Sequence, residues 1–434
     1  MKSSETTVRE IFASALKAAD PSVAVAKQAA RIRSMKSAGA YSLLHVIGFG
    51  KASISMAQAA EEHLGDIIDE GVVITKYGHA GKHGLKKIRV HEAGHPVPDE
   101  NGVKGAADIL DLAGRSDENS LVVVLISGGG SALFVSPVTG LSLRDKQETT
   151  SLLLRAGADI SELNTVRKHL SKVKGGRLAE LLYPATTISL ILSDVIGDHL
   201  DVIASGPTAP DTSSYRDALI TLEKFRLLDI VPQRTTKLIH DGIGGIIPET
   251  PKEGNRIFRK VENMIVGSNR LSLKAAKDAA EERGLNVELL SAEISGEARE
   301  VGKRLARIAF EAKRRGGNQL PLCIISGGET TVTVTGSGKG GRNMELALAF
   351  AMEIDGTDGI TLLSAGTDGT DGPTDAAGAI VDGMTVRIAG GKGLNPAEYL
   401  ADNDSYNFFR ETGGLLVTGP TGTNVMDMQI MVIE

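Results

Sequence analysis

The sequence contains no tryptophan, and its 434 residues include one cysteine and only 3% aromatic residues. A single cysteine, Cys323, excludes an intrachain disulfide, and its position in an apolar run predicts a buried thiol. The scarcity of aromatic rings argues against the stacking platforms that hold single-stranded nucleic acid. The N-terminus has the pattern of an amphipathic helix rather than of an export signal, so we expect a reducing, cytoplasmic environment.

Long apolar runs and a surplus of basic residues are also missing. No stretch approaches the ~20 apolar residues of a membrane-spanning helix, so we expect no membrane partner. The 48 Lys and Arg residues are outnumbered by 54 Asp and Glu residues, and the net charge is −6. This balance argues against nucleic acid as a partner, although a local basic pocket is compatible with it. The expected partners are small molecules, and we expect a monomer or a homodimer.

Glycine is abundant, with 51 residues, and β-branched apolar runs alternate with helical patterns along most of the chain. This alternation predicts an α/β fold with Rossmann-like, mostly parallel sheets. A break rich in proline and glycine at residues 230–256 predicts a domain boundary or hinge. We therefore expect two α/β domains, residues 1–237 and 238–434, with an active-site cleft between them.

Two local predictions accompany this organisation. The first helix is expected over residues 7–19, because Thr7 and Glu10 have the spacing of a capping box. A strand is expected over residues 330–335, where threonine and valine alternate.

Gly-rich loops follow two of the expected strands. In open α/β sheets, ligands bind in the loops at the carboxyl ends of the strands. The first loop carries Gly50, Lys51 and Ser53 into a helix start, where backbone N–H groups attract phosphate, but a plain tight turn explains it equally well. The second loop directly follows an apolar strand and has the composition of an anion nest, although a flexible loop is the alternative. Its residues are Ser127, Gly128, Gly129, Gly130 and Ser131.

A basic segment and an acidic loop follow. Residues 163–177 are locally basic, which is typical either of a solvated helix face or of cations near a phosphate; Asn164, Arg167 and Lys168 are the candidates. Asp194 and Asp198 follow the strand expected at residues 187–192. Carboxylates at such a position can hold Mg²⁺ or accept a hydroxyl proton, and they are also common turn residues.

The second half of the chain repeats the pattern of strand, glycine loop and helix. Gly328 and Glu329 follow one strand, Arg342 opens a helix after two glycines, and Asp368 lies in a Gly-rich loop. So many polar loops on strand ends indicate a large anionic ligand. Residues 91–95 match the letters of the zinc motif HExxH, but Gly94 and Pro96 exclude the helix that this motif requires.

Taken together, these loops resemble the class II glycerate kinases, whose C-terminal part is called the MOFRL domain. Residues 230–256 match nothing specific, whereas the matching segments span nearly the whole chain in the order of the family. They are residues 48–53, 92–99, 127–133, 163–177, 192–198, 205–208, 326–329, 340–345, 366–372 and 419–424.

The resemblance implies transfer of the ATP γ-phosphate to D-glycerate, usually at the 2-hydroxyl, with Mg²⁺ as the metal. In the family, a lysine in the first glycine loop and an arginine before a C-terminal helix are the critical cations; here they are Lys51 and Arg342. Lys51 would neutralise the transferring phosphoryl group, and Arg342 would clamp a carboxylate or phosphate. Asp194 would orient the hydroxyl or position Mg²⁺ together with Asp198, and Glu329 and Asp368 are weaker carboxylate candidates.

Two other functions compete with this hypothesis. An NAD(P)H-dependent hydroxypyruvate reductase would need a dinucleotide fingerprint, and the first loop lacks its third glycine. A non-catalytic protein that binds phosphorylated metabolites is the second alternative, because a fold does not fix a function.

Overall fold

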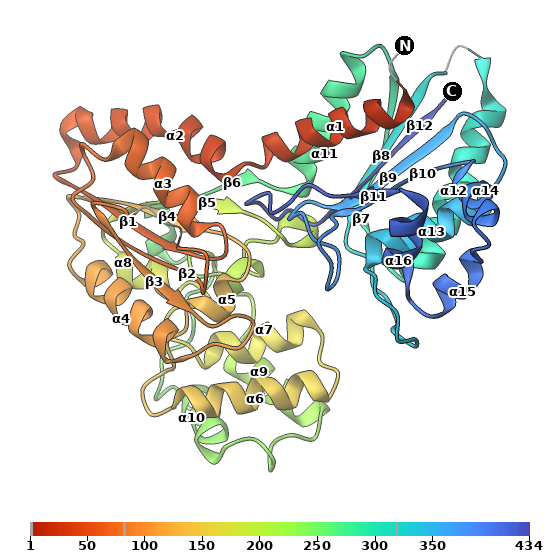
Figure 1. Cartoon of the computed structure of the whole chain (residues 1–434). Helices are drawn as coiled ribbons and strands as arrows, with labels where there is room; N and C mark the ends of the chain where they lie inside the picture. The colour runs from red at the N-terminus through yellow and green to blue at the C-terminus, as the bar shows by residue number, and fades with distance from the viewer. Residues whose placement is uncertain (1–2, 81–83, 318–319) are drawn as a thin grey trace. The chain divides into compact units, whose positions relative to one another are not determined.

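A computed structural model describes residues 3–80, 84–317 and 320–434 of the protein. The chain forms two compact units (Figure 1). The first unit comprises residues 21–193 and 198–266, and the second comprises residues 267–434 together with the first 20 residues and residues 194–197. Each unit contains a six-stranded sheet with helices packed on it, which confirms the expected α/β class. In the described part of the chain, no helix is both long and apolar enough to cross a membrane.

The first unit has a sheet in the order β3-β2-β1-β4-β5-β6. The β1–β2, β1–β4, β2–β3 and β4–β5 pairs are parallel, as expected from the sequence. The strands are β1 (Leu43–Phe49), β2 (Glu70–Lys76), β3 (Ile88–Ala93), β4 (Ser120–Ile126), β5 (Thr186–Leu192) and β6 (Val261–Gly267). The helices are α2 (Pro21–Met35), α3 (Ser53–Leu64), α4 (Glu100–Gly114), α5 (Gly130–Leu133), α6 (Leu143–Arg155), α7 (Ile160–His169), α8 (Arg177–Leu182), α9 (Tyr215–Lys224) and α10 (Gln233–Ile243). Short helical turns lie at Lys36–Ala40, Ile196–Asp198, Ile203–Ser205 and Arg256–Lys260.

Strand β4 is buried along its whole length, because both faces of this parallel sheet are covered. Helices α2 and α3 bury Ile32 and Met56 against Leu44 and Leu121 of the sheet. A separate apolar cluster joins α6, α7, α9 and α10 around the buried Tyr215. This helical layer positions α7, which carries the basic segment.

The sheet of the second unit has the order β11-β10-β9-β12-β8-β7 and is mixed. Only the β7–β8 pair is parallel, whereas β12 lies between β8 and β9 and is antiparallel to both. The mostly parallel arrangement therefore describes the first sheet only. The strands are β7 (Asn286–Ile294), β8 (Leu322–Gly328), β9 (Ile360–Gly366), β10 (Gly378–Asp382), β11 (Leu415–Leu416) and β12 (Asp427–Ile433). The helices are α1 (Ser4–Ala18), α11 (Asn269–Glu281), α12 (Ala298–Arg315), α13 (Arg342–Glu353), α14 (Thr385–Gly391), α15 (Pro396–Ala401) and α16 (Ser405–Thr412).

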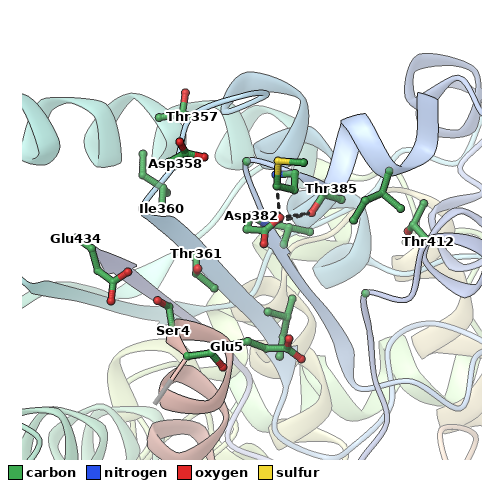
Figure 2. A pocket seen from close by; sticks show the side chains of 18 of the residues that line it. Ser4, Glu5, Thr357, Asp358, Ile360, Thr361, Asp382, Thr385, Thr412 and Glu434 are labelled. Carbon is green, nitrogen blue, oxygen red and sulfur yellow. Dashed lines mark hydrogen bonds between the residues drawn. The ribbon is translucent and has the colours of Figure 1, made fainter. Parts of the chain in front are cut away.

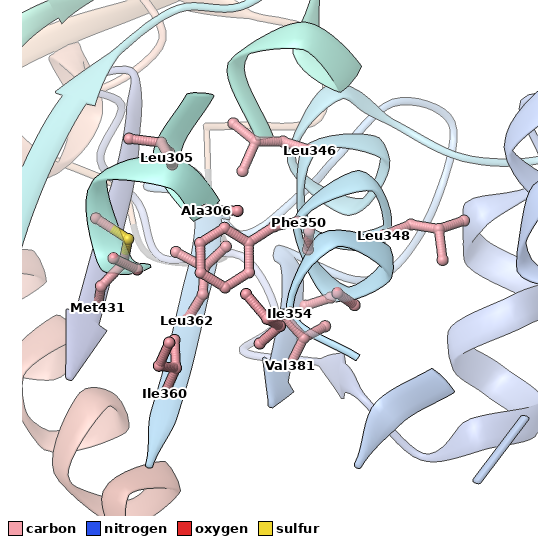
Figure 3. Close-up of a cluster of buried hydrophobic side chains, with 14 of the residues drawn as sticks. Leu305, Ala306, Leu346, Leu348, Phe350, Ile354, Ile360, Leu362, Val381 and Met431 are labelled. Atoms are coloured by element: carbon pink, nitrogen blue, oxygen red, sulfur yellow. The ribbon is translucent and has the colours of Figure 1, made fainter. Parts of the chain in front are cut away.

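Helices cover both faces of the second sheet. Figure 3 shows Leu305 of α12 and Phe350 of α13 packed with Leu362 of β9 and Met431 of β12. Another buried cluster joins α1 and α11 to β8, β9 and β12, and it includes Cys323, whose predicted burial is confirmed. The first helix of the chain is therefore part of the core of the second unit.

Helix α1 begins earlier than expected. Ser3 has extended backbone and its hydroxyl accepts a hydrogen bond from the N–H of Thr6, so Ser3 is the N-cap. Thr7 already lies inside the helix and its hydroxyl donates to the carbonyl oxygen of Ser3. The expected capping box of Thr7 and Glu10 is therefore wrong, because a serine upstream supplies the cap.

The chain passes between the units after residues 20, 193, 197 and 266. The break at residues 230–256 lies inside the first unit, and the expected boundary between residues 237 and 238 falls within α10. The prolines of this segment mark packed turns rather than a linker. For example, the carbonyl oxygen of Pro251 accepts from the N–H of Asp211, and the hydroxyl of Thr250 donates to the carboxylate of Asp211.

Residues 330–335 do not form the expected strand. They belong to the loop that leads from β8 to α13. Thr331 forms only an isolated backbone bridge with Glu297. Side chains accept from N–H groups further along the segment: the N–H of Thr333 donates to Glu297, and the N–H of Thr335 donates to Asn403. Local β-propensity was overridden here by tertiary hydrogen bonds.

Candidate functional site

The first two glycine loops are joined directly to each other. They follow the neighbouring strands β1 and β4, so their ends meet at one edge of the sheet. The N–H of Lys51 donates to the carbonyl oxygen of Gly128 over 2.8 Å, and the N–H of Ala52 donates to the hydroxyl of Ser127 over 3.0 Å. Gly50 has a φ of 128°, and a Cβ atom there would lie 2.2 Å from the Ser127 hydroxyl. Only glycine permits this approach.

Ser53 supports the first loop rather than facing a ligand. Its side chain is fully buried, and its hydroxyl is in hydrogen-bonding distance of the carbonyl oxygens of Gly50 and Ile74. A phosphate-binding role for Ser53 therefore has no geometric support.

Gly129 lies between Lys51 and His95. It has a φ of 79°, and a Cβ atom there would lie 2.9 Å from His95 Cδ2 and 3.2 Å from Lys51 Cγ. Among the described residues, the Lys51 ammonium has no hydrogen bond or ion pair. Burial and the nearby Lys51, Lys76 and His79 lower the pKa of His95 to about 4, so its imidazole is neutral near pH 7. An unpaired ammonium and a neutral imidazole thus flank the glycine loop.

A hydrogen-bonded chain continues from this loop to α7. The buried Lys174 donates to the carbonyl oxygen of Ser131 over 2.8 Å and reaches the hydroxyl of Ser131. That hydroxyl bonds to the Ser205 hydroxyl, which donates to Asn164 Oδ1 over 2.9 Å. Ser205 adopts a φ of 63°, an uncommon backbone conformation that concentrates at functional sites.

Several cations of this region lack a carboxylate partner. Burial lowers the pKa of Arg167, and its guanidinium has no hydrogen bond or ion pair within the parts of the chain described here. Lys146 and Lys174 are buried and bonded to backbone carbonyls or Ser131, and burial lowers the pKa of each well below its ordinary value. Such a group of positive or potentially positive side chains favours an anion.

Lys168 differs from these cations. It is buried, and its ammonium pairs with Asp211 over 3.1 Å and with Asp201 over 3.4 Å. Asp211 also accepts from Ser213 and Thr250, so the group is a closed network. The geometry gives Lys168 a structural role and leaves Arg167 and Asn164 as the better candidates of the basic segment.

In the second unit, Arg342 is the first residue of α13 and two carboxylates surround its guanidinium. Nε donates to Asp427 Oδ2 over 2.6 Å and Nη2 donates to Asp427 Oδ1 over 3.0 Å, which is a bidentate pair. Nη1 donates to Glu329 Oε1. Burial opposes the charged form, but Asp427 and Glu329 raise the pKa of Arg342 above its ordinary value.

Two buried carboxylates stabilise this helix start. Asp371 accepts from the N–H groups of Asn343 and Met344 and so caps α13. Burial raises the pKa of Asp371 to about 6, and burial raises that of Asp427 to about 7 against the opposing effect of Arg342. The short bidentate pair with Arg342 opposes this effect of burial and favours the carboxylate form of Asp427.

Arg342 lines a pocket of about 630 Å³ together with Gly341, Asp368 and Asp371. Asp368 accepts from the N–H and hydroxyl of Thr370, as turn aspartates commonly do, and is partly buried. Gly328 ends β8 with a φ of 144°, and a Cβ atom there would lie 2.2 Å from the carbonyl oxygen of Ile294. Gly328 therefore shapes the strand end from which Glu329 reaches Arg342.

Asp194 and Asp198 lie in the loop after β5. Asp194 is partly buried, and Asp198 adopts a φ of 56° in a short helical turn. Across the described residues, no group of three or more His, Cys, Asp or Glu side chains has an arrangement that could hold a metal ion. Proteins usually bind Mg²⁺ through one or two carboxylates together with substrate phosphates, so Asp194 and Asp198 each have a suitable ligand type for this ion.

A second pocket of the second unit lies at the other end of the strands, where β9 begins and β10 ends. Figure 2 shows Glu5 of α1, Asp358 before β9, Asp382 at the end of β10 and Glu434, which line this pocket. Its volume is about 400 Å³. None of the residues proposed from the sequence lines this pocket. The loops with glycine, Arg342 and Asp368 lie instead where β8 and β9 end.

Sequence reasoning missed five residues of these two sites: His95, Lys174, Ser205, Asp371 and Asp427. The first four occur in segments that carry the family resemblance, so a signal was available for them. Asp427 had no such signal, because β12 was not recognised as a strand between β8 and β9.

The fold and these loops define a class of protein: α/β units whose strand ends present cations and backbone amides to a small anionic ligand. A family model described as "Domain of unknown function (DUF4147)" matches residues 7–240, and one described as "MOFRL family" matches residues 322–427. The "D-glycerate 2-kinase" of Thermotoga maritima is 48% identical over 89% of this chain and 90% of its own length. The "Glycerate 2-kinase" of Pyrococcus horikoshii is 44% identical over 90% of this chain and 87% of its own length.

A solved structure agrees with these sequence comparisons. The crystal structure of the glycerate kinase from Thermotoga maritima matches this fold with a TM-score of 0.91 at 44% identity, over 100% of both chains. The chain therefore belongs to the glycerate kinase family that carries the MOFRL domain.

Proposed function

We propose that this protein transfers the γ-phosphoryl group of ATP to the 2-hydroxyl of D-glycerate and releases 2-phosphoglycerate and ADP. The observation that carries the proposal is the unpaired Lys51 ammonium beside Gly129 and a neutral His95. The names of the similar proteins support the choice of glycerate and of its 2-hydroxyl. Phosphoryl transfer needs positioning and charge stabilisation more than covalent chemistry, and this set of groups supplies both.

In the proposed mechanism, Lys51 neutralises charge on the transferring phosphoryl group. The loop from Gly128 to Ser131 contributes backbone N–H donors at the end of β4. Arg167 has no carboxylate partner among the described residues and adds a second positive group to this unit. Arg342 of the second unit binds a carboxylate or phosphoryl oxygen of the same substrate pair.

The acceptor hydroxyl loses its proton when the phosphorus–oxygen bond forms. We assign the orientation of this hydroxyl to Asp194, which follows β5 at the carboxyl edge of the parallel sheet. Asp194 and Asp198 would hold Mg²⁺, which would supply charge neutralisation on the ATP phosphates when bound. A cleft that receives ATP and D-glycerate and excludes water is part of this proposal, because water exclusion suppresses ATP hydrolysis.

Phosphorus NMR of the protein with ATP, Mg²⁺ and D-glycerate tests the proposal. We expect equal amounts of ADP and a phosphomonoester whose proton coupling identifies the 2-position. A product at the 3-position would correct the regiochemistry alone. Inorganic phosphate without a glycerate ester would contradict the kinase activity.

The two competing functions are tested with the same preparation. Oxidation of NADH or NADPH by hydroxypyruvate, without coupling enzymes, would indicate a reductase, and we expect none. Calorimetric binding of glycerate or ATP without any turnover would indicate the non-catalytic alternative.

A further inference from the structure

The two carboxylates that contact Arg342 differ in burial. The side chain of Asp427 is 1% exposed, whereas that of Glu329 is 47% exposed. Asp427 takes two N–H groups of the guanidinium at 2.6 and 3.0 Å, and Glu329 takes one, on Nη1. One partner is therefore inaccessible and bidentate, and the other is accessible and bonded through a single nitrogen.

The backbone fixes Asp427 in place. It is the first residue of β12, where it pairs with Gly328 of β8 and Gly366 of β9. Its carbonyl oxygen also accepts from Asn269 Nδ2 over 3.0 Å. Two neighbouring strands therefore hold the backbone of Asp427, and its carboxylate is buried against Arg342. Removal of one partner of such a buried pair would leave the other charge uncompensated.

Glu329 is attached differently. Its backbone N–H donates to the carbonyl oxygen of Ile294, but its side chain extends from the strand end into solvent-accessible space. Exposed ion pairs contribute little net free energy, because both side chains are also well solvated apart. Another anion can therefore replace Glu329 on Nη1 at small cost.

The carboxylates around Arg342 mean that an anionic ligand can bind there only if it replaces Glu329. One guanidinium facing two carboxylates leaves this group with a net negative charge. Asp368 and Asp371 line the pocket beside Arg342 and add further carboxylates. A carboxylate or phosphoryl group that approached Arg342 would be repelled unless an existing negative charge moved away.

We propose that Asp427 is the permanent positioning residue of Arg342, and that Glu329 occupies the place of an anionic ligand group until that group displaces it. The ligand group is the carboxylate of glycerate or a phosphoryl group of ATP. The inference rests on the proposed function, from which it takes these two substrates.

The variant Glu329→Gln tests the displacement. Loss of the competing carboxylate should lower the KM of one substrate by about two- to five-fold, the range that an exposed ion pair supports. The kcat should stay within about two-fold of wild type. The substrate whose KM falls is the one that Arg342 binds. Unchanged KM values for both substrates, or a large loss of kcat, would overturn the exchange.

A general charge effect must be separated from displacement. Asp375→Asn removes one carboxylate from the loop beyond Pro373, which lines the pocket, and Asp375 bonds to the Tyr406 hydroxyl rather than to Arg342. The comparison is best made at about 0.5 M salt, where long-range repulsion between carboxylates and an anionic substrate is screened and direct contacts persist. An equal fall in KM for Asp375→Asn would overturn the proposal.

A double-mutant cycle tests the positioning role of Asp427. Asp427→Asn should lower kcat at least about ten-fold in the wild-type background, because the amide cannot accept both N–H groups. In the Arg342→Ala background the same change should have almost no further effect on kcat. An equal kcat loss in both backgrounds would mean that Asp427 acts through folding, and melting curves of all four proteins identify that case.

Failure of this inference is distinguishable from failure of the proposed function. Wild-type turnover in the phosphorus NMR experiment tests the function by itself. If wild type is inactive, calorimetric titration of wild type and Glu329→Gln with D-glycerate and with ATP still tests the exchange. Tighter binding of one ligand by the variant supports it, and equal binding of both overturns it.

Discussion

At the residue scale, the two candidate catalytic cations are in opposite situations. Lys51 has no hydrogen bond or ion pair with the described residues, whereas Arg342 forms ion pairs with Asp427 and Glu329. An unpaired ammonium in a Gly-rich loop contributes little to the free energy of unfolding. We therefore expect Lys51 to serve ligand binding rather than stability. Arg342 also stabilises the start of β12, because its removal leaves the buried carboxylate of Asp427 without a cationic partner.

This difference predicts separable effects of alanine substitution. Lys51→Ala should lower kcat/KM at least about 10²-fold with almost no change in Tm, because a cation at a transferring phosphoryl group contributes strongly to the rate. Arg342→Ala should lower kcat/KM by a similar factor and also lower Tm. Arg342→Lys should not restore activity, because the planar fork is lost.

Steady-state kinetics and thermal melting check both expectations, with Lys104→Ala on the exposed face of α4 as the control. If Lys51→Ala keeps more than about a tenth of wild-type kcat/KM, a barrier change below ~1.4 kcal/mol, Lys51 is not catalytic.

His95 provides a pH-dependent prediction. Burial and neighbouring cations lower its pKa from 6.5 to about 4, so the folded protein binds this proton more weakly than the unfolded chain. The contribution of His95 to the free energy of unfolding is therefore complete above about pH 6.5 and decreases as the pH falls toward 4. His95→Gln should lose less stability than wild type over this window. Urea unfolding at several pH values measures it, and parallel curves for the two proteins would show that the environment of His95 is not as described.

At the element scale, the strand ends were readable from the sequence, whereas partners across the sheet were not. The apolar runs of β1, β4, β5, β8 and β9 are short and end in glycine or polar residues, so each strand and its loop could be predicted. The insertion of β12 between β8 and β9 depends on long-range pairing that has no local pattern. Asp427 was missed for that reason, although Arg342 beside it was found.

The second glycine loop approaches Lys51 and His95 closely at Gly129. Gly129→Ala would place a Cβ atom 2.9 Å from His95 Cδ2 and 3.2 Å from Lys51 Cγ, and would also require an unfavourable φ of 79°. Gly140 has a similar φ of 94°, but a Cβ atom there has nothing within 4 Å. The two substitutions therefore share backbone strain, roughly 1 kcal/mol, and differ in the contact with Lys51 and His95.

We expect both alanine variants to lose similar stability, and only Gly129→Ala to lose activity, by at least about ten-fold in kcat/KM. Urea unfolding and steady-state kinetics on the pair give the comparison. Equal activities would mean that the second glycine loop does not approach the reacting groups.

At the scale of the whole molecule, the sequence predicted two α/β domains but not which of the two sheets the first helix packs on. Helix α1 packs with α11 on the second sheet, while α2, which starts at Pro21, packs with α3 on the first sheet. Both helices present apolar faces of small and branched side chains. Periodicity reveals such a face, but it does not reveal which sheet covers it.

Matched substitutions in these adjacent helices test the assignment. Ile11 of α1 and Ile32 of α2 are both fully buried, so Ile11→Ala and Ile32→Ala should each cost about 2–5 kcal/mol of stability. The location of the loss should differ. Ile11→Ala should speed amide hydrogen exchange in β8, β9 and β12, and Ile32→Ala should speed it in β1 and β4, because each helix covers only its own sheet. Exchange measured by mass spectrometry on the full chain resolves these segments. Faster exchange of β1 and β4 in Ile11→Ala, with β8, β9 and β12 unchanged, would place α1 on the first sheet and contradict the division of the chain described above.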